Sequence, residues 1–162
     1  MQSCGRKELP MDANKPARNP VRVFFPVEQD ESGYPAVSRE QIWCVPTKDD
    51  LFLVDNTPFY AREISMGDEI SVERRGRELW FSKLHKRSRN TTLRAFARND
   101  DFAPALIPKL RSFGGVTEKM EGSPLIAVSL PPGADIAGAL EFLDRESAVG
   151  NVAFEESSVR YR

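Results

Sequence analysis

The sequence contains few histidine or cysteine side chains that could act as a base or a nucleophile. His85 is the only histidine, and the two cysteines are Cys4, near the N-terminus, and Cys44, within an apolar segment. A nucleophile and its base must lie within hydrogen-bond distance of each other, and a third group must orient the base. No sequence motif indicates that Cys44 and His85 form such a pair. We therefore expect Cys44 to be a buried, inert thiol and His85 to be solvated at the end of a basic strand.

Motifs for metals and cofactors are missing from the sequence. It contains no Cys-x-x-Cys, no Gly-rich phosphate loop and no His-Glu-x-x-His. The acidic pairs Asp30-Glu31 and Asp49-Asp50 could offer oxygen ligands to a divalent cation, but paired acids in turns are usually solvated. We predict no metal, no cofactor and no catalytic residue, although carboxylate chemistry depends on a pocket geometry that a sequence does not define.

The strongest electrostatic feature is a basic run. Between Arg74 and Arg98, nine Lys and Arg residues stand against one acid, Glu78, whereas the net charge of the whole chain is -1. Trp80 and Phe81 interrupt the run, and cations combined with aromatic rings are typical of surfaces that bind nucleic acid. The candidate nucleic-acid-binding residues are Arg74, Arg75, Arg77, Lys83, Lys86, Arg87 and Arg89.

Two observations count against nucleic-acid binding. The isoelectric point near 5.9 is low for such a protein. The expected strand Leu125 to Leu130 has no aromatic residue, unlike the sheet of an RNA-recognition motif. The alternatives for the basic run are a solvated turn that leads into a basic junction between two halves, and salt bridges to an acidic protein surface.

Length and composition are those of an ordinary globular protein. The 162 residues, 40% hydrophobic and 29% charged, suffice for one domain or two small ones. No apolar run approaches the ~20 residues of a membrane-spanning helix. Residues 1–20 are polar and contain several prolines, without the apolar core of a secretory signal, and we expect a disordered leader there. Two cysteines cannot form a disulfide framework, which favours a cytoplasmic location.

The stretch Leu51 to Glu73 has the most explicit structural pattern. A strand ends at Asp55-Asn56-Thr57-Pro58, which predicts a corner because Pro58 fixes its own φ and the polar side chains favour turns. Phe59 and Tyr60 follow, either as a plug for the end of a barrel or as an exposed surface, and Gly67-Asp68 predicts the next turn. Over residues 21–89 we predict a small SH3-like β-barrel or bent antiparallel sheet with strands at 21–27, 42–45, 51–55, 69–73 and 78–85, and one helical turn at 38–41.

Residues 90–162 have a different pattern. A strand at 91–97 precedes a helix that Asp100 and Asp101 could cap, and a second helix begins after Asp135. A hairpin at 116–130 lies between the helices, and a last strand occupies 151–155. The order βαββαβ predicts a ferredoxin-like half, so the whole chain is expected to be an α+β protein.

The corner, the Gly-Asp turn and the neighbouring strands resemble an uncharacterised bacterial family of domains of unknown function. Members carry a Leu-Trp pair, an Asp-Asn-x-Pro-Phe-aromatic-Ala corner, a Gly-Asp turn and a Ser/Asn-Thr-x-Arg strand. The likeness covers roughly residues 21 to 155 and departs at Ile42, where the family has Leu. The matching residues are Ile42, Trp43, Asp55, Asn56, Pro58, Phe59, Tyr60, Ala61, Gly67, Asp68, Thr92 and Arg94. The resemblance implies no established activity; it implies a small bacterial cytoplasmic protein, a class often found as accessory or immunity partners.

We therefore predict a non-enzymatic protein-binding module, specifically an immunity protein, or antitoxin, that covers the active site of a cognate toxin. Such an inhibitor works through a charged, complementary surface with aromatic anchors. The alternatives are a protein that associates with RNA or DNA through Arg74 to Arg89, and a small enzyme with carboxylate chemistry. No membrane partner is expected. The residues expected to contact the protein partner are Tyr34, Asp49, Asp50, Tyr60 and Trp80.

Overall fold

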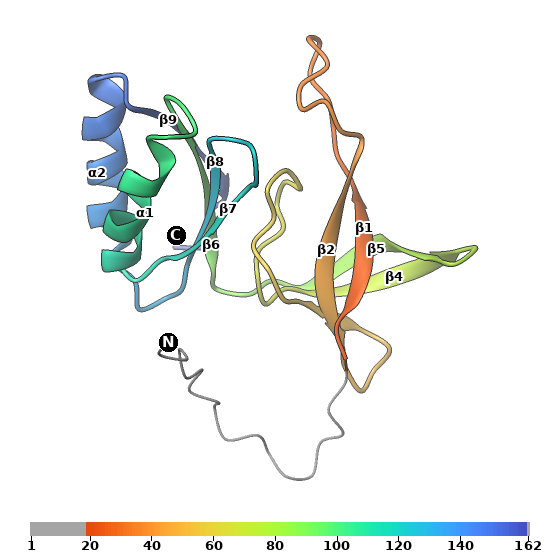
Figure 1. Cartoon of the computed structure of the whole chain (residues 1–162). Coiled ribbons are helices and arrows are strands. Elements are labelled where there is room, and N and C mark those ends of the chain that lie inside the picture. The colour runs from red at the N-terminus through yellow and green to blue at the C-terminus, as the bar shows by residue number, and fades with distance from the viewer. Residues whose placement is uncertain (1–18, 162) are drawn as a thin grey trace, which may run out of the picture.

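The computed structural model describes residues 19–161 and consists of a barrel followed by a second sheet with two helices (Figure 1). The predicted disordered leader at residues 1–20 lies almost entirely outside the described residues. The barrel strands are β1 Val21–Pro26, β2 Arg39–Pro46, β3 Phe52–Val54, β4 Glu69–Arg75 and β5 Glu78–Lys86. The second half contains β6 Thr91–Ala97, α1 Ala103–Ser112, β7 Val116–Lys119, β8 Leu125–Leu130, α2 Ile136–Ala148 and β9 Val152–Ser158.

The barrel closes because β1 pairs with strands on both of its sides. It is antiparallel to β2 from Val21 to Pro26 and parallel to β5 where Phe24 faces Trp80. Alternate residues point inward, as the period of a strand requires, and the buried core of the barrel contains Val23, Phe25, Ile42, Cys44, Val54, Ala61, Ile64 and Ile70. The predicted barrel is confirmed.

The predicted helical turn at residues 38–41 is wrong. Strand β2 already begins at Arg39, which pairs with Pro26 of β1. The Ser38 carbonyl accepts a hydrogen bond from the Val27 N–H at 2.9 Å, which extends the ladder beyond the strand ends. Cross-strand hydrogen bonds therefore outweigh the weak local capping pattern.

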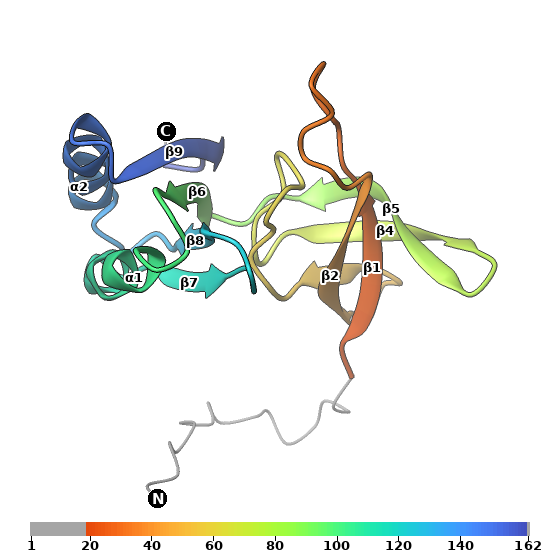
Figure 2. The ribbon, with the colours of Figure 1, turned by 45° about the horizontal axis from the view of Figure 1, so that its top comes forward.

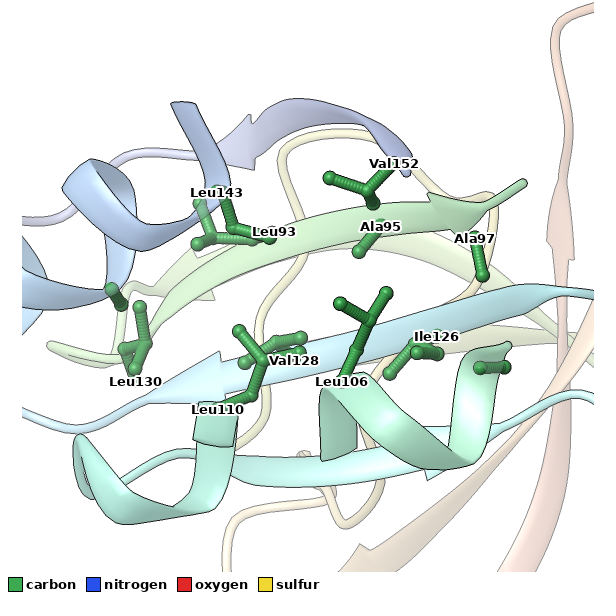
Figure 3. Packing of buried hydrophobic residues seen from close by; sticks show 12 residues of the cluster. Leu93, Ala95, Ala97, Leu106, Leu110, Ile126, Val128, Leu130, Leu143 and Val152 are labelled. Atoms are coloured by element: carbon green, nitrogen blue, oxygen red, sulfur yellow. The ribbon is translucent and has the colours of Figure 1, made fainter. Parts of the chain in front are cut away.

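The second sheet has the order β7-β8-β6-β9, and all neighbouring strands are antiparallel. With the two helices this gives the predicted βαββαβ, ferredoxin-like arrangement. Both helices cover the face of the sheet that lies away from the barrel (Figure 2). The core between the helices and the sheet includes Leu93, Leu106, Leu110, Ile126, Val128 and Leu143 (Figure 3). Neither helix found between residues 19 and 161 is long and apolar enough to cross a membrane.

One of the two predicted helix caps is confirmed. The Asp135 carboxylate accepts the Gly138 N–H at 2.9 Å at the start of α2. The expected cap of α1 by Asp100 or Asp101 is wrong, because the N-cap residue is Phe102 and no side chain caps this helix. The Phe102 N–H donates to Asn99 Oδ1 at 2.8 Å, in the turn before the helix. Asp100 instead forms an ion pair with Lys119.

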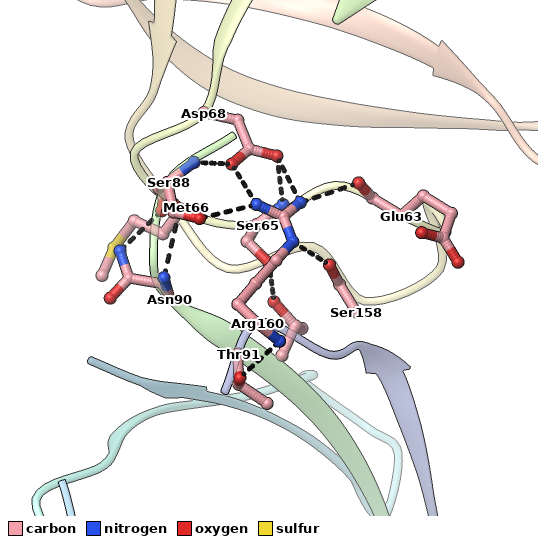
Figure 4. A network of polar contacts seen from close by, with 10 residues as sticks. Glu63, Ser65, Met66, Asp68, Ser88, Asn90, Thr91, Ser158 and Arg160 are labelled. Carbon is pink, nitrogen blue, oxygen red and sulfur yellow. Dashed lines mark hydrogen bonds and ion pairs between the residues drawn. The ribbon is translucent and has the colours of Figure 1, made fainter. Parts of the chain in front are cut away.

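A buried ion pair joins the C-terminal segment to the barrel half (Figure 4). The Asp68 carboxylate is fully buried and accepts two hydrogen bonds from the Arg160 guanidinium, each at 3.0 Å. It also accepts the backbone N–H groups of Ser65 and Ser88 at 2.9 and 2.7 Å. The Arg160 guanidinium in turn donates to the Glu63 carbonyl at 3.0 Å. The loop between β3 and β4, the link after β5 and the chain end after β9 thus meet at one carboxylate.

Replacing Asp68 by Asn should destabilise the protein strongly. The variant keeps the side-chain shape but leaves the Arg160 side chain, only 5% exposed, without its counter-charge. We expect the free energy of unfolding, measured by urea denaturation, to fall by about 3 kcal/mol or more. Glu73→Gln is the control, because it breaks an exposed ion pair with Arg75 and should cost less than about 1 kcal/mol. Equal losses in the two variants would contradict a structural role for the buried pair.

Candidate functional site

The corner after β3 is held by charged side chains on both sides. The Glu40 carboxylate of β2 accepts the backbone N–H groups of Phe59, Tyr60 and Ala61 at 2.6, 2.9 and 2.8 Å. From the second sheet, Arg94 donates to the carbonyls of Phe59 and Tyr60 at 3.0 and 3.1 Å. Neither aromatic residue belongs to the barrel core, so the first of the two alternatives, a plug for the end of the barrel, is wrong. They lie, half-buried, where the corner meets the second sheet.

Glu118 of β7 contacts the same corner. Its carboxylate accepts hydrogen bonds from the Thr57 backbone and from the Asn56 side chain. Burial raises the pKa of Glu118 above its ordinary value of 4.5, with smaller contributions from Glu40 and Asp55, while the two hydrogen bonds act in the opposite direction. The neutral form of Glu118 is therefore favoured on folding.

Cys44 and His85 are placed as the sequence predicts. Cys44 is fully buried in the barrel core, where burial, assisted by Asp55, raises the pKa of its thiol to about 12. The thiol therefore stays protonated at neutral pH and is a poor nucleophile. His85 is exposed on β5. Within residues 19–161, no three His, Cys, Asp or Glu side chains gather as metal ligands.

The five predicted partner-binding residues lie in three places. Tyr34, 48% exposed, is 6.2 Å from the Phe96 ring, and burial, with a smaller effect from Tyr60, raises its pKa. Tyr60 is half-buried, and its hydroxyl donates to the Met120 sulfur. Asp49 and Asp50 are exposed between β2 and β3, and Trp80 lies on β5. The structure therefore brings Tyr34 and Tyr60 together and separates them from the other three.

The seven predicted nucleic-acid-binding residues are all exposed. They extend from the end of the long β4–β5 hairpin, at Arg74 to Arg77, to the link between the halves, at Arg87 to Arg89 (Figure 1). All seven are solvated, and Arg75 in addition contacts an aromatic ring. Its guanidinium stacks 4.6 Å from the centre of the Trp80 ring.

The outer side of the barrel has two neighbouring groups of stacked aromatic rings and guanidinium groups. Trp80 stacks on Phe24 at 5.3 Å, and Arg39 lies over both rings at 6.0 and 4.4 Å. Further along β1 and β2, Arg22 lies 4.8 Å over Trp43, which is 44% exposed. We call this surface the aromatic–arginine face; it consists of Arg22, Phe24, Arg39, Trp43, Arg75 and Trp80.

Two glutamates fix the geometry of this face. Glu78 pairs with Arg39 at 3.2 Å and accepts the Trp80 indole N–H at 2.9 Å. Glu73 pairs with Arg75. Exposed ion pairs contribute little to stability, but here they hold planar guanidinium groups against aromatic rings. Phe24 is buried beneath this layer and Trp80 is half-buried, so the face presents to solvent mainly Trp43 and the ordered guanidinium groups.

Sequence reasoning singled out Trp80 and Arg75 but missed most of this face. Phe24 and Arg22 were regarded only as parts of a strand, and Trp43 only as a mark of a family. The available signal was the alternation of the first strand, which puts Val23 and Phe25 inside and Phe24 outside. The face is assembled by the pairing of β1 with both β2 and β5. This pairing joins segments distant in the sequence, so no local sequence pattern predicts it.

The chain belongs to a family described as a domain of unknown function, DUF4265, whose model matches residues 40–154. No curated protein matches the chain. Among solved structures, it is similar to a hypothetical protein from Neisseria gonorrhoeae described as a novel crystal structure. That likeness has a TM-score of 0.73 at 19% sequence identity and covers 89% of this chain and 98% of that one. At such identity it shows a shared fold alone.

Glu118→Gln should change how stability depends on pH. Because the pKa of Glu118 is raised on folding, its contribution to stability is present below about 4.5 and is lost as the pH rises through the folded-state pKa. A glutamine stays neutral, so the variant should gain stability relative to the wild type as the pH rises above 4.5, the ordinary pKa of the carboxyl group, measured by urea denaturation. Glu121→Gln, at an exposed position, is the control. Identical pH profiles for the two variants would contradict the proposed burial effect.

Proposed function

We propose that this chain is a non-enzymatic protein-binding module, and that the aromatic–arginine face is its principal contact surface. The observation that carries the proposal is the exposed Trp43, stacked with Arg22 beside the Phe24–Trp80 pair. Trp and Arg are the residues most enriched among the energetic hot spots of protein interfaces. Because stacking already orders these side chains, binding costs less conformational entropy.

The chemistry of the face favours a partner with carboxylate groups. Three arginines stand against two glutamates, and each guanidinium can form paired hydrogen bonds with a carboxylate. The partner surface would also need an apolar patch opposite Trp43. Complementary charge of this kind accelerates association and selects the partner.

More narrowly, we propose that the module acts as a bacterial immunity protein that covers the active site of a cognate toxin. An inhibitor of this type needs a rigid, preorganised surface rather than a titrating group. Rigidity of this kind is supported by the Glu40 hydrogen bonds to the backbone of the corner and by the buried Asp68–Arg160 pair. If the partner proves to be a protein other than a toxin, only this narrower proposal is wrong, and the broader proposal of a protein-binding module stands.

Association with nucleic acid is the second candidate. It is favoured by the seven exposed basic residues from Arg74 to Arg89. Bases bind to proteins of this kind by stacking on open aromatic faces. The Trp80 ring already contacts Phe24 and the guanidinium of Arg75, which leaves little of it for a base.

Purification from the native host, with nuclease treatment omitted, tests the two candidates. The tagged protein is isolated, and its companions are measured by mass spectrometry and by the ratio of ultraviolet absorbances. We expect one stoichiometric protein partner and no nucleic acid. Nucleic acid that is released by salt would overturn the proposal, because counterion release is the mark of phosphate contacts.

Trp43→Ala should weaken the complex. Loss of an exposed aromatic anchor is expected to cost about 2 kcal/mol or more, roughly thirtyfold in Kd, measured by surface plasmon resonance with the purified partner. Arg39→Ala should act in the same direction. Val149→Ala and Arg145→Ala, at exposed positions near the end of α2, are the matched controls. Unchanged affinity in Trp43→Ala would exclude the aromatic–arginine face as the interface.

The predicted role of Asp49 and Asp50 has its own test. Replacing both with Lys should slow association roughly tenfold at low ionic strength if a basic part of the partner, apart from the carboxylates opposite the aromatic–arginine face, approaches these two positions. The double variant Asp101→Lys with Asp144→Lys, at two exposed positions of the second half, carries the same change of charge. Stopped-flow association rates equal to those of this control would remove the two aspartates from the interface.

A further inference from the structure

A small cavity opens at one end of the barrel, apart from the aromatic–arginine face. Its volume is about 300 Å³, and its apolar wall consists of Leu51, Phe52, Val72 and Leu79. Three of these residues, Phe52, Val72 and Leu79, pack at the edge of the barrel core and stay only partly buried. The remaining lining residues are Pro46, Thr47, Asp50 and Arg74. The barrel core is therefore not closed at this end.

Two opposite charges, one acidic and one basic, line this cavity. Neither the Asp50 carboxylate nor the Arg74 guanidinium makes a hydrogen bond or an ion pair with another residue of the range 19–161. Arg74 comes from β4, and Asp50 from the turn between β2 and β3. A cavity with an apolar wall, a cation and an anion suits a ligand that has all three complementary parts.

The backbone of Asp50 is held in a special conformation. Its φ is 56°, in the left-handed region that few residues other than Gly adopt. The turn is closed by the Leu51 carbonyl, which accepts both the backbone N–H and the hydroxyl of Thr47 at 2.8 and 3.1 Å. Such strain persists where the surrounding structure fixes it, and it occurs often at ligand sites. Here the fixed turn places the carboxylate in the lining of the cavity.

We propose that this cavity binds an apolar α-amino acid in its zwitterionic form. The α-carboxylate would face Arg74, the α-ammonium group would face Asp50, and the side chain would lie against Phe52, Val72 and Leu79. The volume is at the lower end of the range for small-molecule sites, which fits a single amino acid. Neighbouring residues of a strand point to opposite faces. Arg74 therefore lines this cavity, whereas Arg75 belongs to the aromatic–arginine face.

Calorimetry with the full chain tests the ligand class. The probe is L-phenylalanine, with 3-phenylpropionate, which lacks the ammonium group, and phenethylamine, which lacks the carboxylate. We expect L-phenylalanine to bind at least about tenfold more tightly than either analogue, because each loses one charged contact. L-leucine should also bind, and glycine should bind more weakly than both. Absence of heat from L-phenylalanine and L-leucine at millimolar concentration would overturn the proposal.

Matched variants locate the site. Arg74→Gln and Asp50→Asn should each weaken binding of L-phenylalanine about tenfold. Their exposed neighbours Arg77 and Asp49 do not line the cavity, so Arg77→Gln and Asp49→Asn should leave it unchanged. Thermal melting checks that all four variants are folded. Equal binding by 3-phenylpropionate and L-phenylalanine, or equal losses in the control variants, would refute the assignment of the two charges.

Discussion

The loop of residues 55–68 depends on charged side chains that satisfy its backbone groups. A buried N–H or carbonyl without a partner costs free energy, and this loop lies between the barrel and the second sheet (Figure 1). Glu40 accepts three of its N–H groups, and Arg94 donates to two of its carbonyls. Arg160 adds a bond to the Glu63 carbonyl. Both halves therefore contribute charges to one loop, and this couples their positions.

Periodicity and turn chemistry predicted most of the fold. Alternating apolar residues located the strands, and Asp135 marked the start of α2. The Gly-Asp turn was also recognised: Gly67 has φ of +87°, and a Cβ there would lie 3.2 Å from the Cβ of Ser88. The anchoring of the corner by Glu40 was not predicted, because its partners lie 19 to 21 residues away. Long-range pairing also explains why the expected helical turn at residues 38–41 is a strand.

The candidate surfaces were harder to predict than the fold, since each is assembled from strands distant in sequence. Trp80 was singled out for its neighbouring basic residues, yet its partners Phe24 and Arg39 come from β1 and β2. Tyr34 and Tyr60 were chosen separately, and the structure places them near each other through the loop after β1. Asn56 of the corner and Asp68 of the Gly-Asp turn support backbone structure. Exposed residues, in contrast, carry the proposed contacts.

The central claim, that the aromatic–arginine face binds another protein, is tested most directly by photocrosslinking in the native host. A benzophenone amino acid replaces Trp43, and, as the control, Val149, which is 70% exposed near the end of α2. The account predicts one defined protein adduct from position 43 and none from position 149. No protein adduct at position 43, or the same adducts from both positions, would contradict it.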